Sequence, residues 1–188
     1  MSFVPQGYKL PQSPSKYLKL EEGTYKLRIL SEQPFIFYEY FTNDNKPVLL
    51  KEKPTTLPEN IKPNKFTQKK EIDEVWGLTV YNHDTEQVQI LKIPQVSIKK
   101  AIIALAENPD CGNPTGYDIT ITRAKDASGK TTYAVIASVK SREVPAEALA
   151  TAKTVKLSEL AIAGGKPFDG ADEEETVDSV AKDMEQAF

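Results

Sequence analysis

The stretch VWGLTVYNHDTEQVQILKIP, residues 75–94, decides the fold class. Residues 75–81 and 87–93 alternate between the two faces of an extended chain, which is typical of β-strands. Five polar residues separate the two segments, and Pro94 ends the second one. Two short strands joined by a polar turn predict a β-hairpin.

The chain that follows this hairpin predicts a helix and a second hairpin. Four apolar residues recur at the i, i+3, i+4 and i+7 positions of one helix face: Ile98, Ala101, Ile102 and Leu105. A helix is therefore expected over residues 95–107, ended by Pro109 because proline cannot continue the hydrogen-bond ladder. Residues 117–125 and 131–139 then alternate around a turn that contains Gly129, which predicts the second hairpin.

Two further strands are expected before these elements, at residues 24–30 and 35–41. An isolated hairpin is barely stable, so all these strands should share one sheet. Their order around a single helix predicts a mainly β protein, a five-stranded Greek-key barrel of the oligonucleotide-binding (OB) type. The expected organisation is an extended N-terminal arm (1–20), the barrel domain (21–143, with a long loop 42–73), a short helical segment and linker (144–168), and an acidic tail (169–188).

Composition excludes several classes of protein. One cysteine, Cys111, cannot form an internal disulfide, and one histidine, His83, cannot complete a four-ligand zinc site with it. A magnesium nuclease would need paired acids, and two pairs flank the strand 75–81: Asp73 with Glu74, and Asp84 with Glu86. Both pairs lie in polar turns, where acids are ordinary. We therefore expect no cofactor, no metal and no catalysis. No apolar run is long enough to span a membrane and no signal peptide is recognisable, so a cytoplasmic protein is expected.

The net charge of −3 hides a division along the chain. Residues 169–188 contain eight acids and one lysine, which gives −7, whereas residues 1–168 contain 23 bases and 19 acids, which gives +4. A basic body with an acidic tail indicates binding to a polyanion, with the tail as a competing anion. The alternative is an ordinary domain with a solubilising tail.

The strand 35–41 is almost entirely aromatic, and both of its faces cannot be buried in a small barrel. Exposed rings beside cations form a platform on which the bases of a single strand stack. We expect Phe35, Phe37 and Trp76 in the core. The rings predicted to stack are Tyr38, Tyr40, Phe41, Tyr81 and Phe66.

Seven lysines in the loop 42–73 predict a track for phosphates, although five acids dilute its field, and a merely solvated loop is the alternative. The predicted phosphate contacts are Lys46, Lys51, Lys53, Lys65, Lys69, Lys70 and Arg28.

Several stretches resemble the single-stranded DNA-binding proteins encoded by tailed bacteriophages. They are YEYFTNDNKPV (38–48), VWGLTVYN (75–82), VQIL (88–91), GYDITITR (116–123) and PQGY (5–8). The resemblance covers roughly residues 5–145. It departs at Phe41, where related proteins often have tryptophan, a change that preserves stacking.

This resemblance implies an OB barrel that coats single-stranded DNA during phage replication, recombination and repair, in the cytoplasm of the host bacterium. It also implies a monomer or weak homo-oligomer whose acidic tail recruits a DNA polymerase, helicase or recombinase. The tail residues concerned are Asp172, Glu173, Glu174, Glu175, Asp178 and Phe188. Two alternatives remain: a protein-interaction or scaffold module that uses the tail, and an RNA-binding protein, because a contact to the 2′-OH would be needed to discriminate.

Overall fold

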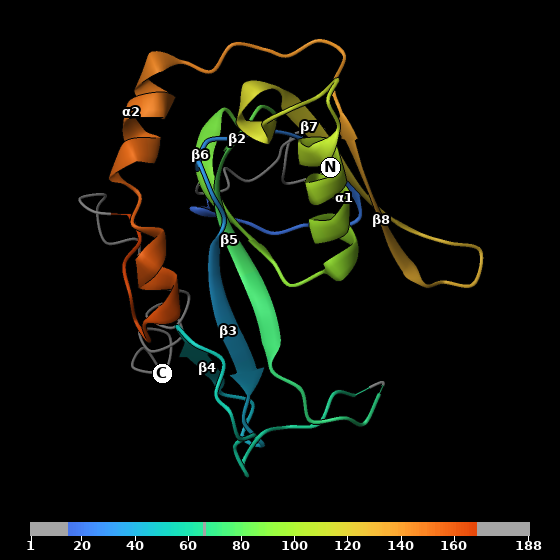
Figure 1. Cartoon of the computed structure of the whole chain (residues 1–188), viewed down its shortest axis with the longest axis vertical. Coiled ribbons are helices and arrows are strands. Elements are labelled where there is room, and N and C mark those ends of the chain that lie inside the picture. Colours follow the sequence, from blue (N-terminus) through green and yellow to red (C-terminus); the bar gives the residue numbers. More distant parts are fainter. Residues whose placement is uncertain (1–14, 66, 169–188) are drawn as a thin grey trace, which may run out of the picture.

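The computed structural model describes residues 15–65 and 67–168 (Figure 1). Within these residues, eight strands form one open, mixed sheet, accompanied by two α-helices and two short 3₁₀ helices. A mainly β protein was predicted, and this is confirmed. The strands are β1 (Tyr17–Leu18), β2 (Gly23–Ile29), β3 (Phe35–Phe41), β4 (Pro47–Leu50), β5 (Asp73–Asn82), β6 (Gln87–Ile93), β7 (Asp118–Lys125) and β8 (Thr131–Ala137). The helices are α1 (Val96–Glu107), η1 (Pro114–Gly116), α2 (Ala146–Thr154) and η2 (Leu157–Ala161).

The order across the sheet is β1-β6-β5-β2-β7-β8, and β3 joins it through β5 and carries β4. Only the pairing of β1 with β6 is parallel among these strands. One edge of β5 pairs with β6, and its other edge is shared. The first half of that shared edge pairs with β3, where Phe35 lies opposite Gly77, and the second half pairs with β2, where Ile29 lies opposite Val80.

The main core lies between the sheet and α1. Four apolar side chains of β5 and β6 point toward this helix: Leu78, Val80, Leu91 and Ile93. Ile98 and Ile102 of α1 pack against them. Ile98 and Ile102 are one turn apart on the predicted apolar stripe, so burying that stripe is what docks α1. Trp76 packs at the margin of the same cluster.

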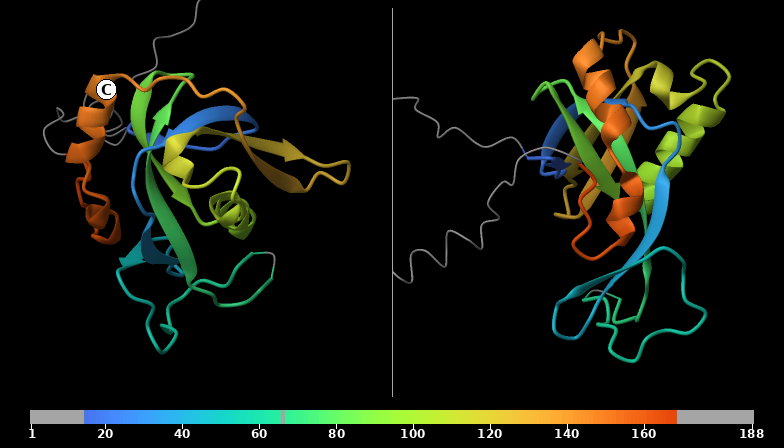
Figure 2. Two further views of the ribbon diagram at one scale, coloured as in Figure 1. Left: turned by 45° about the horizontal axis from the view of Figure 1, so that its top comes forward. Right: turned by 90° about the vertical axis from the view of Figure 1, so that its left-hand side faces the viewer.

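The opposite face of the sheet is covered by residues 145–168, which we call the C-terminal strap. Figure 2 shows the strap and α1 on opposite sides of the sheet. The strap packs Leu160 and Ala161 of η2 against Phe37 of β3 and Ile90 of β6. By contrast α2 has no buried residue, so η2 anchors the strap and α2 adds little.

The connection 42–72 folds back on β3 and β4 and builds a small third cluster. Ile61 and Ile72 are buried there with Tyr40, and Thr42 bridges to Ile61. Together β3, β4 and this connection form an arm that extends from the body of the sheet (Figure 1). The connection was expected to lack structure of its own, and in its described residues it instead carries β4 and buried side chains.

Candidate nucleic-acid interface

A hollow of about 360 Å³, which we call the arm pocket, lies where β3 ends. It is lined by Tyr40, Phe41, Asn45, Lys62, Pro63, Asn64, Lys65, Glu71 and Asp73. The ring of Phe41 is 47% exposed, so it offers a face to solvent. Asn45 has a φ of 61°, a left-handed conformation that asparagine tolerates, and it closes the turn between β3 and β4.

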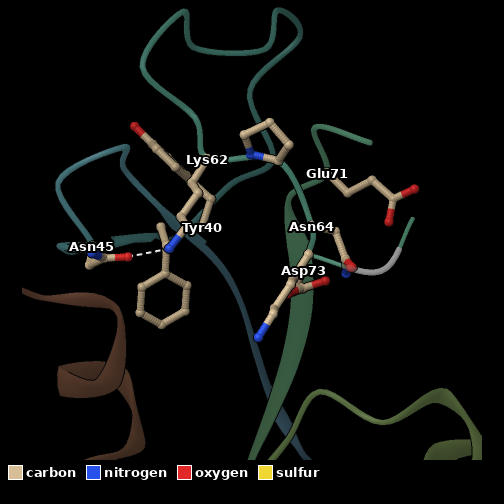
Figure 3. Close-up of a pocket in the computed structure, with 9 residues that line it drawn as sticks. Tyr40, Asn45, Lys62, Asn64, Glu71 and Asp73 are labelled. Atoms are coloured by element: carbon tan, nitrogen blue, oxygen red, sulfur yellow. Dashed lines mark hydrogen bonds between the residues drawn. The ribbon is translucent and has the colours of Figure 1, made fainter. Parts of the chain in front are cut away.

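The backbone brings Lys62 beside Phe41. The Lys62 N–H donates to the Phe41 carbonyl at 2.7 Å, and the Lys62 ammonium donates to Asn45 Oδ1. Figure 3 shows Lys62 reaching Asn45, with Glu71 and Asp73 on the other side of the pocket. Burial, and then the neighbouring Glu71, raise the pKa of Asp73 above its ordinary value, while Lys99 opposes this. The arm pocket therefore combines an exposed ring and cations with an acidic wall.

A second hollow, of about 570 Å³, lies in the gap of the open sheet, and we call it the gap groove. It brings residues of β1 and β6, at one end of the sheet, together with residues of β7 and β8 at the other end. Its walls contain two tyrosines and three cations: Tyr17, Tyr133, Lys19, Lys92 and Arg123. Tyr17 is 41% exposed.

Lys92 occupies the centre of this arrangement. Its ammonium lies 5.6 Å from the ring centroid of Tyr17 and 5.6 Å from that of Phe37. Both distances are within the range in which a cation is attracted to an aromatic face. The guanidinium of Arg123 donates to the Leu20 carbonyl, which fixes its direction in the wall.

The linings of the two hollows are neighbours at one cross-strand pair. Glu39 of β3 lines the gap groove, and Asp73, its partner across β3 and β5, lines the arm pocket. Directly opposed residues of an antiparallel pair point to the same face, so the two carboxylates share one side of the sheet. Burial raises the pKa of Glu39, the charge of Lys92 lowers it, and Asp73 raises it, with a net increase.

Two of the predicted stacking rings are not available in this conformation. Tyr81 is 4% exposed, because it packs edge-on against His83, with ring centroids 5.0 Å apart, under a hollow that α2 also lines. Tyr40 is 9% exposed, because the returning loop covers it with Ile61. For these two the expectation of exposed rings is wrong. Tyr38 is half-buried beside the same cluster, and Phe66 lies outside the described residues.

Arg28, predicted to contact phosphate, is instead partly buried and paired within the protein. Its Nε lies 2.8 Å from Asp118 Oδ1 and its Nη2 donates to the Arg142 carbonyl. His83 Nε2 lies 3.0 Å from the same Asp118 oxygen. Burial favours a higher pKa for Asp118, but the Arg142 N–H, His83 and Arg28 outweigh it and hold that pKa below its ordinary value. Arg28 therefore neutralises a buried carboxylate, and its Nε and Nη2 are engaged within the protein and not turned toward a phosphate.

The predicted lysines are divided by the structure. Lys65 lines the arm pocket, and Lys70 donates to the Glu59 carbonyl at 3.2 Å. The other predicted lysines are exposed on the arm and line neither hollow: Lys46, Lys51, Lys53 and Lys69.

Every aromatic and cationic residue of the gap groove was missing from the predicted set: Tyr17, Lys19, Lys92, Arg123 and Tyr133. Lys62 of the arm pocket is one of the seven loop lysines but was not singled out as a phosphate contact. A signal existed for Lys92, a charged residue in a strand that is otherwise apolar or neutral. No local pattern marks Tyr17, because its position depends on the parallel pairing of a two-residue strand.

The predicted partner-binding residues of the acidic tail lie outside the described residues. In residues 15–65 and 67–168, no cluster of three histidine, cysteine or acidic side chains is arranged to hold a metal ion. In the same part of the chain, no helix has the length and apolar character to cross a bilayer.

Neither a protein-family model, nor a curated protein, nor a solved structure matches this chain.

Proposed function

We propose that this protein binds single-stranded DNA without catalysis and with little dependence on base sequence. The observation that carries the proposal is that two hollows, each with an exposed ring and cations, have linings that are neighbours at the cross-strand pair of Glu39 and Asp73. A single strand needs this alternation of aromatic faces for bases and cations for phosphates, whereas a duplex keeps its bases stacked internally.

The topology supports the same proposal. We infer that the five strands in the order β6-β5-β2-β7-β8 correspond to an OB barrel that is open between β6 and β8, within a sheet of eight strands. Such a barrel has its helix between its third and fourth strands, and α1 lies between β6 and β7, the third and fourth of these five strands in chain order. On this inference the gap groove would lie between the strands and loops that OB barrels present to oligonucleotides.

The proposed path runs from the gap groove to the arm pocket. Tyr17 and Phe41, 41% and 47% exposed, would each stack on a base. Lys92 and Lys62 would each neutralise a phosphate. Each stacked base contributes about 1–3 kcal/mol, so two rings supply much of the affinity irrespective of sequence.

The biological setting proposed is phage DNA replication, recombination and repair in the cytoplasm of the host bacterium. The acidic tail would recruit a polymerase, helicase or recombinase and compete with DNA for the basic body. Its eight acids and single lysine give it a high density of negative charge, the property by which it would compete with a DNA strand.

The test is a fluorescence-anisotropy titration of labelled oligo(dT), oligo(rU) and a duplex with the full chain. Tight, salt-dependent binding of oligo(dT) with weak binding of the duplex is expected. Equal affinity for oligo(rU) would make RNA the better assignment. No binding of either single strand would contradict the proposal and favour a protein-interaction module.

Substitutions then locate the site. Phe41→Ala should weaken binding of oligo(dT) by about 1–3 kcal/mol if its ring stacks on a base. The matched control is Ile36→Ala, on the same strand and 44% exposed, which lines neither hollow. A loss that is equal in both variants would place the strand elsewhere.

A further inference from the structure

Glu39 lines the gap groove, and its cross-strand partner Asp73 lines the arm pocket. Glu39 is half-buried on β3, directly opposite Asp73 of β5, so two like charges face each other across an antiparallel pair. Such an arrangement opposes folding, because like charges in directly opposed positions repel. This carboxylate pair lies beside a groove that contains three cations, Lys19, Lys92 and Arg123.

Lys92 lines the gap groove together with Glu39. It is the cation whose charge acts on Glu39, and it also lies between the rings of Tyr17 and Phe37. Because Glu39 and Lys92 line the same groove, the carboxylate of Glu39 in the free protein places a negative charge where a phosphate bound at Lys92 would add a second one. A strand entering the gap groove has to compete with this internal anion.

We propose that Glu39 is a proton-linked gate in the gap groove: its ionised carboxylate competes with phosphate for Lys92, and strand binding draws a proton onto it. This inference rests on the proposed binding of single-stranded DNA. Glu39 acts here as a specificity-determining residue, because its negative charge weakens the binding of every phosphate-bearing ligand in the groove unless the carboxylate takes up a proton.

Other charged and titratable groups near Glu39 set the size of the effect. Asp73 of β5 adds repulsion, and it is itself influenced by Glu71 and by Lys99 of α1. Lys99 is largely engaged, since its ammonium donates to the Glu74 carbonyl at 2.6 Å and to Glu74 Oε1 at 3.2 Å. The remaining wall of the gap groove brings Arg123 of β7, Lys19, and the hydroxyls of Tyr17 and Tyr133.

The sign of the pH dependence follows from these charges. The pKa of Glu39 is already above its ordinary value of 4.5 in the free protein. A phosphate in the groove would raise that pKa further, so the complex binds a proton more tightly than the free protein does. Affinity should therefore fall as pH rises from the pKa of the free protein to that of the complex, and level off above it.

The experiment compares wild type and Glu39→Gln, which keeps the shape and removes the charge, by oligo(dT) anisotropy between about pH 5 and about pH 8. At neutral pH we expect Glu39→Gln to bind about fivefold more tightly, the effect of removing one repulsion of about 1 kcal/mol. The pH dependence should be flatter in the variant. Glu107→Gln makes the same charge change at the exposed end of α1, outside both hollows, and should change neither quantity.

Two further variants keep the result interpretable. Asp73→Asn should also tighten binding, but by less, because Asp73 lines the arm pocket and not the gap groove that contains Lys92. In a Lys92→Gln background, Glu39→Gln should lose most of its effect, since the competition requires that cation. Thermal melting of each variant checks that the fold is intact.

The outcomes separate this inference from the function on which it rests. If wild type binds oligo(dT) but Glu39→Gln has the same affinity and the same pH profile, the gate is refuted and the proposed function stands. If tightening persists in the Lys92→Gln background, the competition for Lys92 is refuted. If wild type binds no single strand at any pH, both fail together.

Discussion

The side chain of Leu160 fills the space above Gly77, so that its Cδ1 methyl lies where a β-carbon at residue 77 would need room. Gly77 is in the middle of β5, opposite Phe35 on one neighbouring strand and Lys92 on the other. Because Gly77 has no side chain, the space above it is filled by the side chain of Leu160 from the C-terminal strap. This knob and hole fix η2 on the face of the sheet opposite α1.

Gly77→Ala should therefore destabilise the fold by about 1–3 kcal/mol, because the added methyl overpacks the site. Leu160→Ala alone should cost about 2–5 kcal/mol, since a side chain that is 3% exposed leaves a cavity. The double variant should be more stable than the sum of the two losses predicts, because the shortened side chain at position 160 leaves room for the methyl added at position 77. Urea unfolding measures all three, and strict additivity would show that Leu160 and Gly77 do not interact.

Asp118→Asn should cost about 3 kcal/mol, because it leaves Arg28 and His83 without their shared buried anion. The lowered pKa of Asp118 in the folded state gives the sign of a pH effect. Its contribution to stability is present above its unfolded pKa of about 3.9 and is lost as pH falls through the folded value. Acid unfolding followed by circular dichroism should show a shallower dependence in the variant. An identical acid transition in wild type and variant would contradict this role.

The affinity for oligo(dT) should fall linearly with salt on logarithmic axes. Each phosphate neutralised on a single strand contributes about −0.7 to the slope. Lys92→Gln and Lys62→Gln should each reduce the slope by about that amount, whereas Lys100→Gln, exposed on α1 and outside both hollows, should leave it unchanged. Equal slopes in all of these proteins would remove Lys62 and Lys92 from the interface.

Removal of residues 169–188 changes the formal charge from −3 to +4. A tethered anionic segment sits at high effective concentration near the basic body, so its removal should tighten binding to oligo(dT). The gain should be greatest at low salt, where screening is weakest. Phe188→Ala keeps every acid and should leave DNA affinity unchanged while it impairs recruitment of a replication partner. Weaker or unchanged DNA binding at low salt after truncation would contradict the competition.

The sequence predicted regular elements well where one physical pattern dominates. The strands 35–41 and 87–93 and the helix beginning near residue 96 appear at the expected positions. The pairing of β1 and the structure of the arm were missed, because each depends on contacts distant in sequence. Tyr17 reaches the gap groove only because β1 pairs with β6, and Ile61 is buried only because the arm closes over Tyr40.

The candidate site was predicted less well than the fold. Aromatic composition identified β3 but could not tell that the strap covers one face near Phe37 while the returning loop covers the other at Tyr40. Phe41 escapes both covers and remains exposed. Likewise the charge of Arg28 gave no hint that Asp118, ninety residues later, would bind it. Burial by remote segments is a tertiary property that a local alternation pattern does not contain.

Trp76, the chain's one tryptophan, faces α1 and not the two hollows. Its ring lies 5.9 Å from the ammonium of Lys99, and its indole N–H is buried. Intrinsic tryptophan emission is therefore an optical reporter of helix docking, and ligands that occupy the hollows should be silent in it. A spectral shift on addition of an oligonucleotide would then signify that α1 itself had moved.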